Sequence, residues 1–228
     1  MPVPAPRYCR RVAYEHFAAA LGSLHETGAL VGAATALSMH ALDDVHPGAV
    51  EERIEALAVG VRRGRTTESR QATIAHLHHV LFEREGFEGN RLDFYDPRNS
   101  YLPQVLATRR GIPISLALIY KAVAERLGLP VTGIGAPGHF LVRIEDESGA
   151  LLIDPFHRGR MLSEEEAFKL MEATLGAAVP RSDRLLQPVD HAGWLVRMLR
   201  NLEAIHSRRA QPRDAAAMAE LRQLVELG

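Results

Sequence analysis

The stretch from residue 111 to residue 130 reads GIPISLALIYKAVAERLGLP. Pro113 suits the first turn of a helix, because the amides of that turn have no partner within the helix and proline lacks only this amide hydrogen. Gly128 suits the residue that ends a helix, and Pro130 prevents the helix from continuing. Between them the side chains are apolar on nearly every side, which is typical of a central, buried helix. We therefore predict a buried central helix over about residues 113–127.

Strand and helix patterns surround this helix. Three strand-like runs follow it, at 131–136, 139–145 and 150–154, and the segment DESG between the last two is a hairpin turn signal. Glycine, proline and asparagine between 85 and 100 indicate a loop. Apolar residues recur at helical spacing in the remaining segments, which are 13–24, 28–42, 48–63, 67–84, 100–110, 163–175, 190–206 and 212–227. This order predicts an α+β fold with an antiparallel sheet.

We expect the chain to form one compact unit, because no low-complexity linker divides it. Its three regions are a helical N-terminal region (1–98), a core with the central helix and the sheet (99–180), and a helical C-terminal segment (181–228). Residues before about 98 should be almost wholly helical and should pack on the core.

The composition is ordinary for a soluble globular protein, with 46% apolar and 24% charged residues. A formal net charge of −1 gives no general attraction to nucleic acid or to an anionic membrane, and no apolar run is long enough to span a bilayer. We therefore expect neither nucleic acid nor membrane among its partners. The segment 1–10 carries three prolines and no apolar core, so we predict a short disordered leader and no secretion signal.

Cys9 is the single cysteine, which excludes a disulfide within the chain and makes a reducing cytoplasm the expected location. Arg7, Arg10 and Arg11 stand beside it, and neighbouring positive charge lowers the pKa of a thiol. The alternative, which we favour, is an incidental residue near a loose terminus.

A histidine and an aspartate stand near the open end of the predicted hairpin. If the strands pair symmetrically around residues 147 and 148, Asp154 lies opposite Leu141. His139 shares a face with Leu141, so His139 and Asp154 become diagonal cross-strand neighbours, the relation in which a carboxylate orients an imidazole. The alternative is a core or turn histidine and an unrelated turn carboxylate, and a one-residue bulge would separate the two.

Ordered motifs resemble the SirB branch of the transglutaminase-like superfamily, over nearly the whole chain from about residue 40. These motifs are LFE (81–83), GF (86–87), Asn90, NSYL (99–102), RRGIPISLA (109–117), GLP (128–130), PGHFLVR (137–143), IDPF (153–156) and RMLRNL (197–202). The resemblance implies a papain-like core in which a cysteine at the start of the central helix, a strand histidine and an acid on the next strand form a triad. It also implies that the C-terminal helices are tetratricopeptide-like.

His139 and Asp154 match the histidine and the acid of that triad. The nucleophile position is Pro113, where active-looking relatives have the cysteine of a Gly-Asn-Cys sequence. Proline has neither thiol nor hydroxyl, so the resemblance implies triad remnants without thiol catalysis. Ser115 is the nearest hydroxyl, but it lies two residues, or about 200°, further round the helix. We expect it to point away from the nucleophile position, with capping of the first turn as its favoured role.

The loop 94–99 (FYDPRN) precedes the central helix, where it could line the same cleft as His139. Tyr95, Asn99 and Ser115 are therefore the candidate ligand-binding residues. The alternative is a well-packed loop without a ligand.

His76, His79 and Glu83 share one helix face at a spacing that zinc sites use. No cysteine or second motif completes such a site, so we expect neither a metal nor another cofactor.

The leading functional hypothesis is a cytoplasmic binding or scaffold protein. Its cleft around His139 and Asp154 would bind a peptide or small ligand, and its C-terminal helical pair would contact a protein partner. The alternative is an unconventional hydrolase or acyltransferase, in which His139 acts as a base on water or on Ser115.

Overall fold

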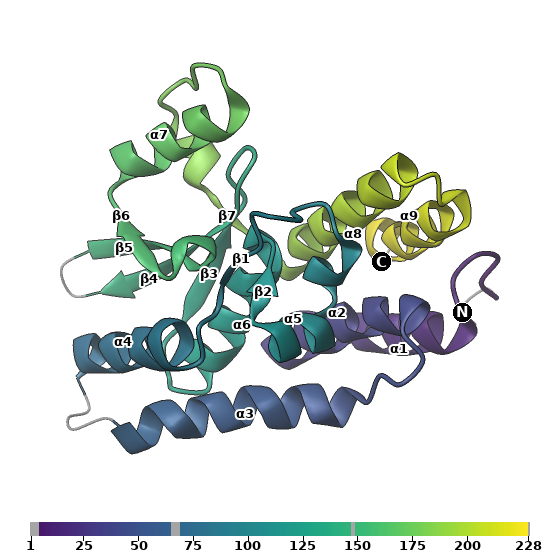
Figure 1. Cartoon of the computed structure of the whole chain (residues 1–228), viewed down its shortest axis with the longest axis horizontal. Helices are drawn as coiled ribbons and strands as arrows, with labels where there is room; N and C mark the ends of the chain where they lie inside the picture. Colours follow the sequence, from purple (N-terminus) through teal and green to yellow (C-terminus); the bar gives the residue numbers. More distant parts are fainter. Residues whose placement is uncertain (1–4, 65–68, 147–148, 228) are drawn as a thin grey trace.

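The computed structural model describes residues 5–64, 69–146 and 149–227. Three predictions fall partly outside these residues: the first four residues of the leader, the start of a helix at Thr67, and the centre of the hairpin turn. Within the described residues, helices precede and follow an antiparallel sheet and pack around a buried central helix (Figure 1). The predicted α+β class is confirmed.

Four helices precede the core, close to their predicted positions. They are α1 (Arg11–Leu21), α2 (Thr27–Ala41), α3 (Pro47–Gly64) and α4 (Arg70–His78). The last one continues as a π-helix, η1 (His79–Arg84). α2 is almost free of charge and buries most of its length, because α1 covers one side of it and helices from later in the chain cover others.

The segment between η1 and the central helix is more regular than the loop predicted there. β1 (Glu88–Gly89) pairs in parallel with β2 (Arg110–Gly111), and between them lie a 3-10 turn, η2 (Pro97–Ser100), and a helix, α5 (Leu102–Thr108). The helix predicted up to Arg110 was therefore too long. The observed helix ends at Thr108, and Arg109 after it takes a left-handed conformation with a φ of 60°.

The central helix α6 (Pro113–Glu125) buries every residue except Glu125, as its apolar circumference predicts. Pro113 is its first residue, and Gly128 closes the turn after it with a φ of 78°. The helix packs against the antiparallel sheet on one side and against α2, α3 and α5 on others. It therefore ties the N-terminal helices to the sheet.

The sheet has five antiparallel strands in the order β6-β5-β4-β3-β7. The strands are β3 (Val131–Ile134), β4 (Leu141–Asp146), β5 (Gly149–Asp154), β6 (Arg160–Leu162) and β7 (Pro188–Val189). β4 and β5 pair without a bulge, with Val142 opposite Ile153 and Glu145 opposite Ala150. This is the register predicted from an even hairpin loop.

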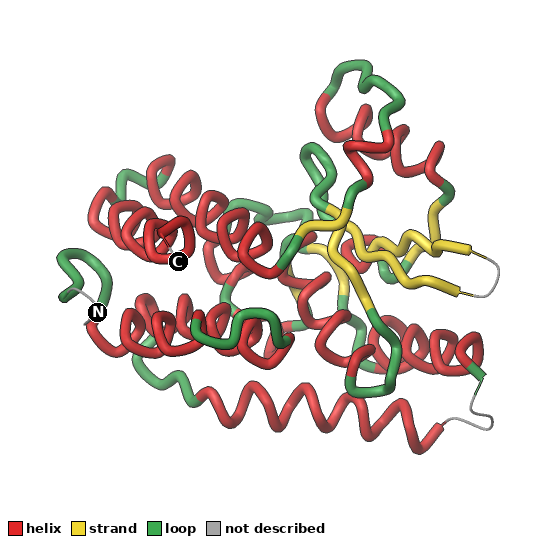
Figure 2. The backbone as a smooth tube through the Cα atoms, turned by 180° about the vertical axis from the view of Figure 1, so that it is seen from behind, coloured by secondary structure: helices red, strands yellow, loops and turns green. Residues whose placement is uncertain are grey.

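Helices return after the sheet. α7 (Glu164–Leu175) begins at the capping serine Ser163, ends at Gly176 and covers a second, smaller apolar core over the sheet. A 3-10 turn, η4 (Asp183–Leu186), leads to β7, and the pair α8 (His191–Arg208) and α9 (Pro212–Leu227) closes the fold. These two helices lie side by side in both backbone views (Figures 1 and 2).

The described part of the N-terminal segment is ordered, in contrast to the predicted leader. The backbone amides of Arg7, Tyr8 and Cys9 donate to the carboxylate of Glu220 on α9, at 2.6, 3.1 and 2.9 Å. Cys9 is only 6% exposed. Burial, together with the charge of Glu220, raises the pKa of its thiol to about 12. The neighbouring arginines thus do not lower this pKa, and Cys9 does not lie at a loose end.

Within the part of the chain that the structure describes, no helix is both long and apolar enough to cross a membrane.

Candidate functional site

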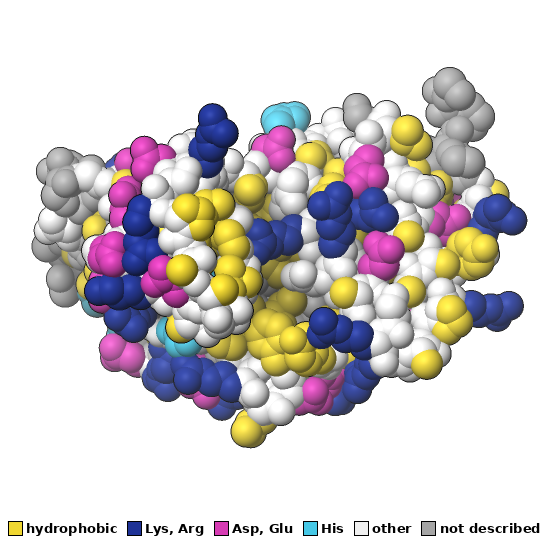
Figure 3. Space-filling model, turned by 90° about the horizontal axis from the view of Figure 1, so that it is seen from above, with side chains coloured by type: hydrophobic (Ala, Val, Ile, Leu, Met, Phe, Trp, Pro, Cys, Tyr) yellow, Lys and Arg dark blue, Asp and Glu magenta, His cyan; other side chains and the backbone are white. Residues whose placement is uncertain are grey.

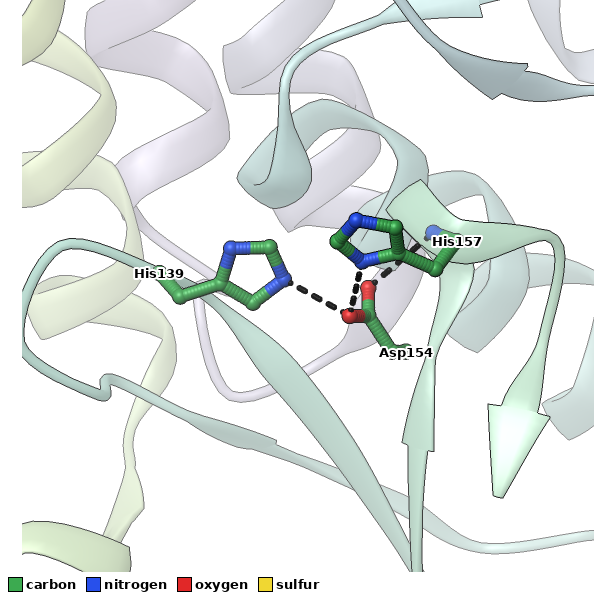
Figure 4. A group of neighbouring side chains, drawn as sticks. All are labelled: His139, Asp154 and His157. Carbon is green, nitrogen blue, oxygen red and sulfur yellow. Dashed lines mark hydrogen bonds and ion pairs between the residues drawn. The ribbon is translucent and has the colours of Figure 1, made fainter. Parts of the chain in front are cut away.

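A tight turn aims His139 at the end of β5. Gly138 takes a φ of 70°, which glycine adopts readily, and a side chain there would meet Thr174. The His139 amide donates to the Ala136 carbonyl (3.1 Å) and closes the turn two residues before β4 begins. His139 Nε2 then lies 3.0 Å from Oδ2 of Asp154, the last residue of β5 (Figure 4). The predicted contact between the two side chains is confirmed, although His139 precedes the strand in which it was expected.

Asp154 also binds a residue that the sequence analysis did not single out, His157. His157 Nδ1 lies 2.6 Å from the same Oδ2, while Oδ1 accepts the backbone amides of Phe156 and His157. The two imidazole rings stack at 5.7 Å, and a nitrogen of each reaches the same carboxylate oxygen (Figure 4). The sequence feature that could have indicated this contact is an aspartate directly before a turn. Asp154 caps the 3-10 turn η3 (Pro155–His157), and this places His157 over the Asp154 carboxylate.

The carboxylate of Asp154 is fully buried and ionised. Burial alone would raise its pKa, but the hydrogen bonds and charges of His139 and His157 outweigh this effect and hold the pKa well below its ordinary value. A carboxylate only accepts hydrogen bonds, so we assign the protons to His139 Nε2 and His157 Nδ1. In neutral His139, Nδ1 is then left as a hydrogen-bond acceptor, and no partner for it exists among the described residues.

A cavity of about 310 Å³ opens beside His139. Its walls come from the loop before α5, the start of α6, the turn at His139 and one face of α8. The lining residues are Phe94, Tyr95, Ile112, Pro113, Ile114, Gly138, His139, Phe140, Arg197, Asn201, Ala204, Ile205 and Arg208. Figure 3 looks down on this side of the molecule and shows a hollow with a largely hydrophobic floor and basic side chains at its border.

Pro113 and His139 therefore border one cavity, whereas Ser115 does not. The Ser115 hydroxyl is fully buried, accepts the Ile112 amide at 3.1 Å and donates to the Asn99 carbonyl at 2.6 Å. It caps the first turn of α6, which is the role expected of it.

Of the other two candidate ligand-binding residues, one lines the cavity and one does not. Tyr95 lines the cavity and is 55% exposed. The Asn99 side chain is buried and binds the carbonyls of Asp93 and Phe94 and the side chain of Asn90, so it holds the loop rather than lining the cavity.

Among the described residues, one group has the spacing of metal ligands, namely His139, Asp154 and His157, whose ligand atoms all lie within 4.8 Å of one another. The nitrogens that face Asp154 already share its oxygen, so a cation would have to displace both N–H protons. On the helix face that carries His76, His79 and Glu83, His79 Nδ1 lies 2.8 Å from the Glu83 carboxylate.

Comparison with known proteins finds related sequences. A UPF0162 protein of Xylella fastidiosa is 46% identical over 138 residues, which cover 59% of this chain and 49% of that protein. A UPF0162 protein of Pseudomonas aeruginosa is 34% identical over 132 residues, 58% of this chain and 47% of its own length. The F-box only protein 21 of Mus musculus is 39% identical over 111 residues, 45% of this chain and 18% of that protein.

The chain thus spans about half the length of the UPF0162 relatives that it matches. No solved structure matches it. A family model described as the transglutaminase-like superfamily matches residues 48–200, which include α6, the sheet and most of α8. The chain belongs to the transglutaminase-like superfamily.

Proposed function

We propose that this chain is a cytoplasmic, non-catalytic binding or scaffold protein of the SirB branch, a pseudoenzyme that binds a ligand in the cavity beside His139. The observation that carries the proposal is the position of Pro113. This residue stands where the resemblance puts the nucleophile, and it borders the same cavity as His139. A pyrrolidine ring there can contact a ligand but cannot attack one.

The other candidate nucleophiles support the same conclusion. The Ser115 hydroxyl is bonded to backbone groups on two sides and lies outside the lining of the cavity. Cys9 is anchored by α9, and its raised pKa keeps the thiol protonated at neutral pH. His139, held by Asp154, retains an acceptor nitrogen that can orient a ligand.

The same pair favours a second function, which is hydrolysis by water. An imidazole that donates through Nε2 to an ionised carboxylate is arranged as a general base at Nδ1. Such an enzyme would form no covalent intermediate, so Pro113 would not prevent it.

A scaffold role would use the surface of α8 and α9, which we propose to be tetratricopeptide-like and to contact a protein partner. In support, the segment related to mouse F-box only protein 21 makes up only 18% of that protein, so related sequence occurs there within a longer chain.

Two measurements on one sample test the proposed function. NMR titration with a library of neutral and charged fragments should shift the amide signals of Gly138, His139 and Ile114 at the cavity. Ester, amide and acyl-transfer probes should show no turnover. Turnover that His139→Ala abolishes would establish the hydrolase instead, and a library that shifts no cavity signal would refute ligand binding there.

A further inference from the structure

The charged side chains that line the cavity beside His139 are basic and not acidic. Two arginines of α8 line it, Arg197 and Arg208, and no carboxylate does so among the described residues. Asp154, the nearest acid to His139, lies behind the imidazole and is already bonded to His139 and His157.

Arg197 is a largely buried cation without an acidic partner among the described residues. Its Nη2 donates to the carbonyls of Ala136 and His139, the latter at 2.7 Å, and its guanidinium lies 5.6 Å from the centre of the Phe140 ring. The carbonyl oxygens accept some of its hydrogen bonds, but no carboxylate among the described residues balances its charge. Burial accordingly lowers the pKa of Arg197.

Arg208 is the second arginine that lines the cavity, and it is exposed. Its guanidinium lies 4.7 Å over the Tyr95 ring, and no carboxylate pairs with it in the described part of the chain. The arginines of this helix that lie outside the cavity differ: Arg200 approaches Glu226 at 3.6 Å, and Arg209, just after the helix, approaches Asp96 at 3.9 Å. Of the arginines of α8 and Arg209, the two without an acidic partner among the described residues are thus the two that line the cavity.

We propose that the cavity recognises a small ligand that carries a carboxylate on an apolar body. The carboxylate would pair with one of the two guanidinium groups, each of which offers paired N–H donors, because eleven residues separate Arg197 from Arg208 along α8 and a helix rises about 1.5 Å per residue. The apolar body would lie against Phe94, Ile112 and Pro113. This inference rests on the proposed function, because it takes the cavity to be the ligand site.

The volume limits the ligand. A cavity of about 310 Å³ is at the lower end of small-molecule sites, so one side chain with its carboxylate fills it. Two sources supply such a group, a free aromatic or aliphatic acid and the C-terminal residue of a peptide. The test below has an arm for each source.

The test compares acids with their uncharged amides by NMR titration of the full chain. The first pair is 3-phenylpropanoate and 3-phenylpropanamide, and the second is N-acetyl-Gly-Phe as its free acid and as its C-terminal amide. We expect at least one acid to bind at the cavity about tenfold more tightly than its amide, because a hydrogen bond to a charged group contributes that much. The pair with the larger ratio identifies the source.

Two variants test which arginine binds the carboxylate of the ligand. Of Arg208→Gln and Arg197→Lys, the variant at the arginine that pairs with the carboxylate should reduce the acid's advantage about fivefold or more, while the thermal midpoint confirms folding. Arg200→Gln is the matched control on the same helix and should leave the advantage unchanged. Equal binding of acid and amide, or an advantage that survives both cavity variants, would overturn the inference while leaving the proposed function intact. Absence of binding by every fragment, neutral ones included, would overturn both.

Discussion

Replacing Pro113 by cysteine tests whether the nucleophile position faces His139. In that geometry the new thiol would lie at the N-terminus of α6 and beside an imidazole, and both environments favour a thiolate. We expect its pKa to fall from the ordinary value of about 8.5 to about 6.5. The substitution should cost little stability, because the first turn of a helix accepts most residues in place of proline.

The rate advantage can be worked out against Cys9, which serves as the internal reference. With a pKa of about 12, Cys9 is ionised only to about 10⁻⁵ at pH 7, whereas a thiol of pKa about 6.5 is mostly ionised. A less basic thiolate is also a weaker nucleophile, which removes roughly two to three of these five decades. Residue 113 should therefore react on the order of 10² times faster than Cys9, before the burial of Cys9 is counted.

The assay is alkylation by iodoacetamide, followed site by site by mass spectrometry between pH 5.5 and 9.5. The rate at residue 113 should have a midpoint near pH 6.5, and adding His139→Ala should raise that midpoint by about one unit or more. The unmodified protein should react negligibly on the same time scale. A midpoint near 8.5 that His139→Ala leaves in place, or labelling no faster than that of Cys9, would show that the triad positions do not apply to this chain.

Three further predictions concern the stability and the organisation of the fold. Asp154→Asn should lower the free energy of unfolding by about 2–3 kcal/mol, because two histidine donors lose a buried charged acceptor, whereas Asp183→Asn at an exposed position should leave the denaturant midpoint unchanged. The folded pKa of Asp154 is depressed, so its contribution to the free energy of unfolding is present above about pH 4 and is lost as the pH falls below that value. An Asp154→Asn variant whose stability falls with acid as steeply as that of the wild type would contradict this. Burial lowers the pKa of His78 to about 4 in the folded chain, so the unfolded chain binds this proton at a higher pH. The free energy of unfolding should therefore decrease as the pH drops from about 6.5 to 4, and His78→Gln should flatten that part of the stability profile. Limited proteolysis should release no stable fragment by cleavage near residue 90, because α6 packs against helices from both sides of that point; recovery of a folded N-terminal fragment would argue for two domains.

The environment of Asp154 shows how much a short segment can organise. The aspartate ends β5, caps the following turn with Oδ1 and holds both imidazoles with Oδ2. His157 therefore competes with His139 for the oxygen that would stabilise a protonated His139.

The sequence by itself determined the features that depend on neighbours along the chain. Apolar residues on every side of 113–127, closed by Pro113 and Gly128, predicted the central helix, because helix burial and capping follow from local periodicity. The hairpin register followed from side-chain alternation and an even loop, and with it came the contact between His139 and Asp154. The proline at residue 113 is likewise a fact of the sequence alone.

Tertiary structure decided what depends on residues far apart in the chain. It paired β1 with β2 across a segment predicted as a loop and a short helix, anchored Cys9 to Glu220, and gave Ser115 a hydrogen-bond partner in Asn99. It also brought two arginines of α8 to the cavity beside His139. Local patterns carry no information about such contacts, because helices and strands choose their neighbours by the shape and polarity of whole faces, and the cavity exists only where several of those faces meet.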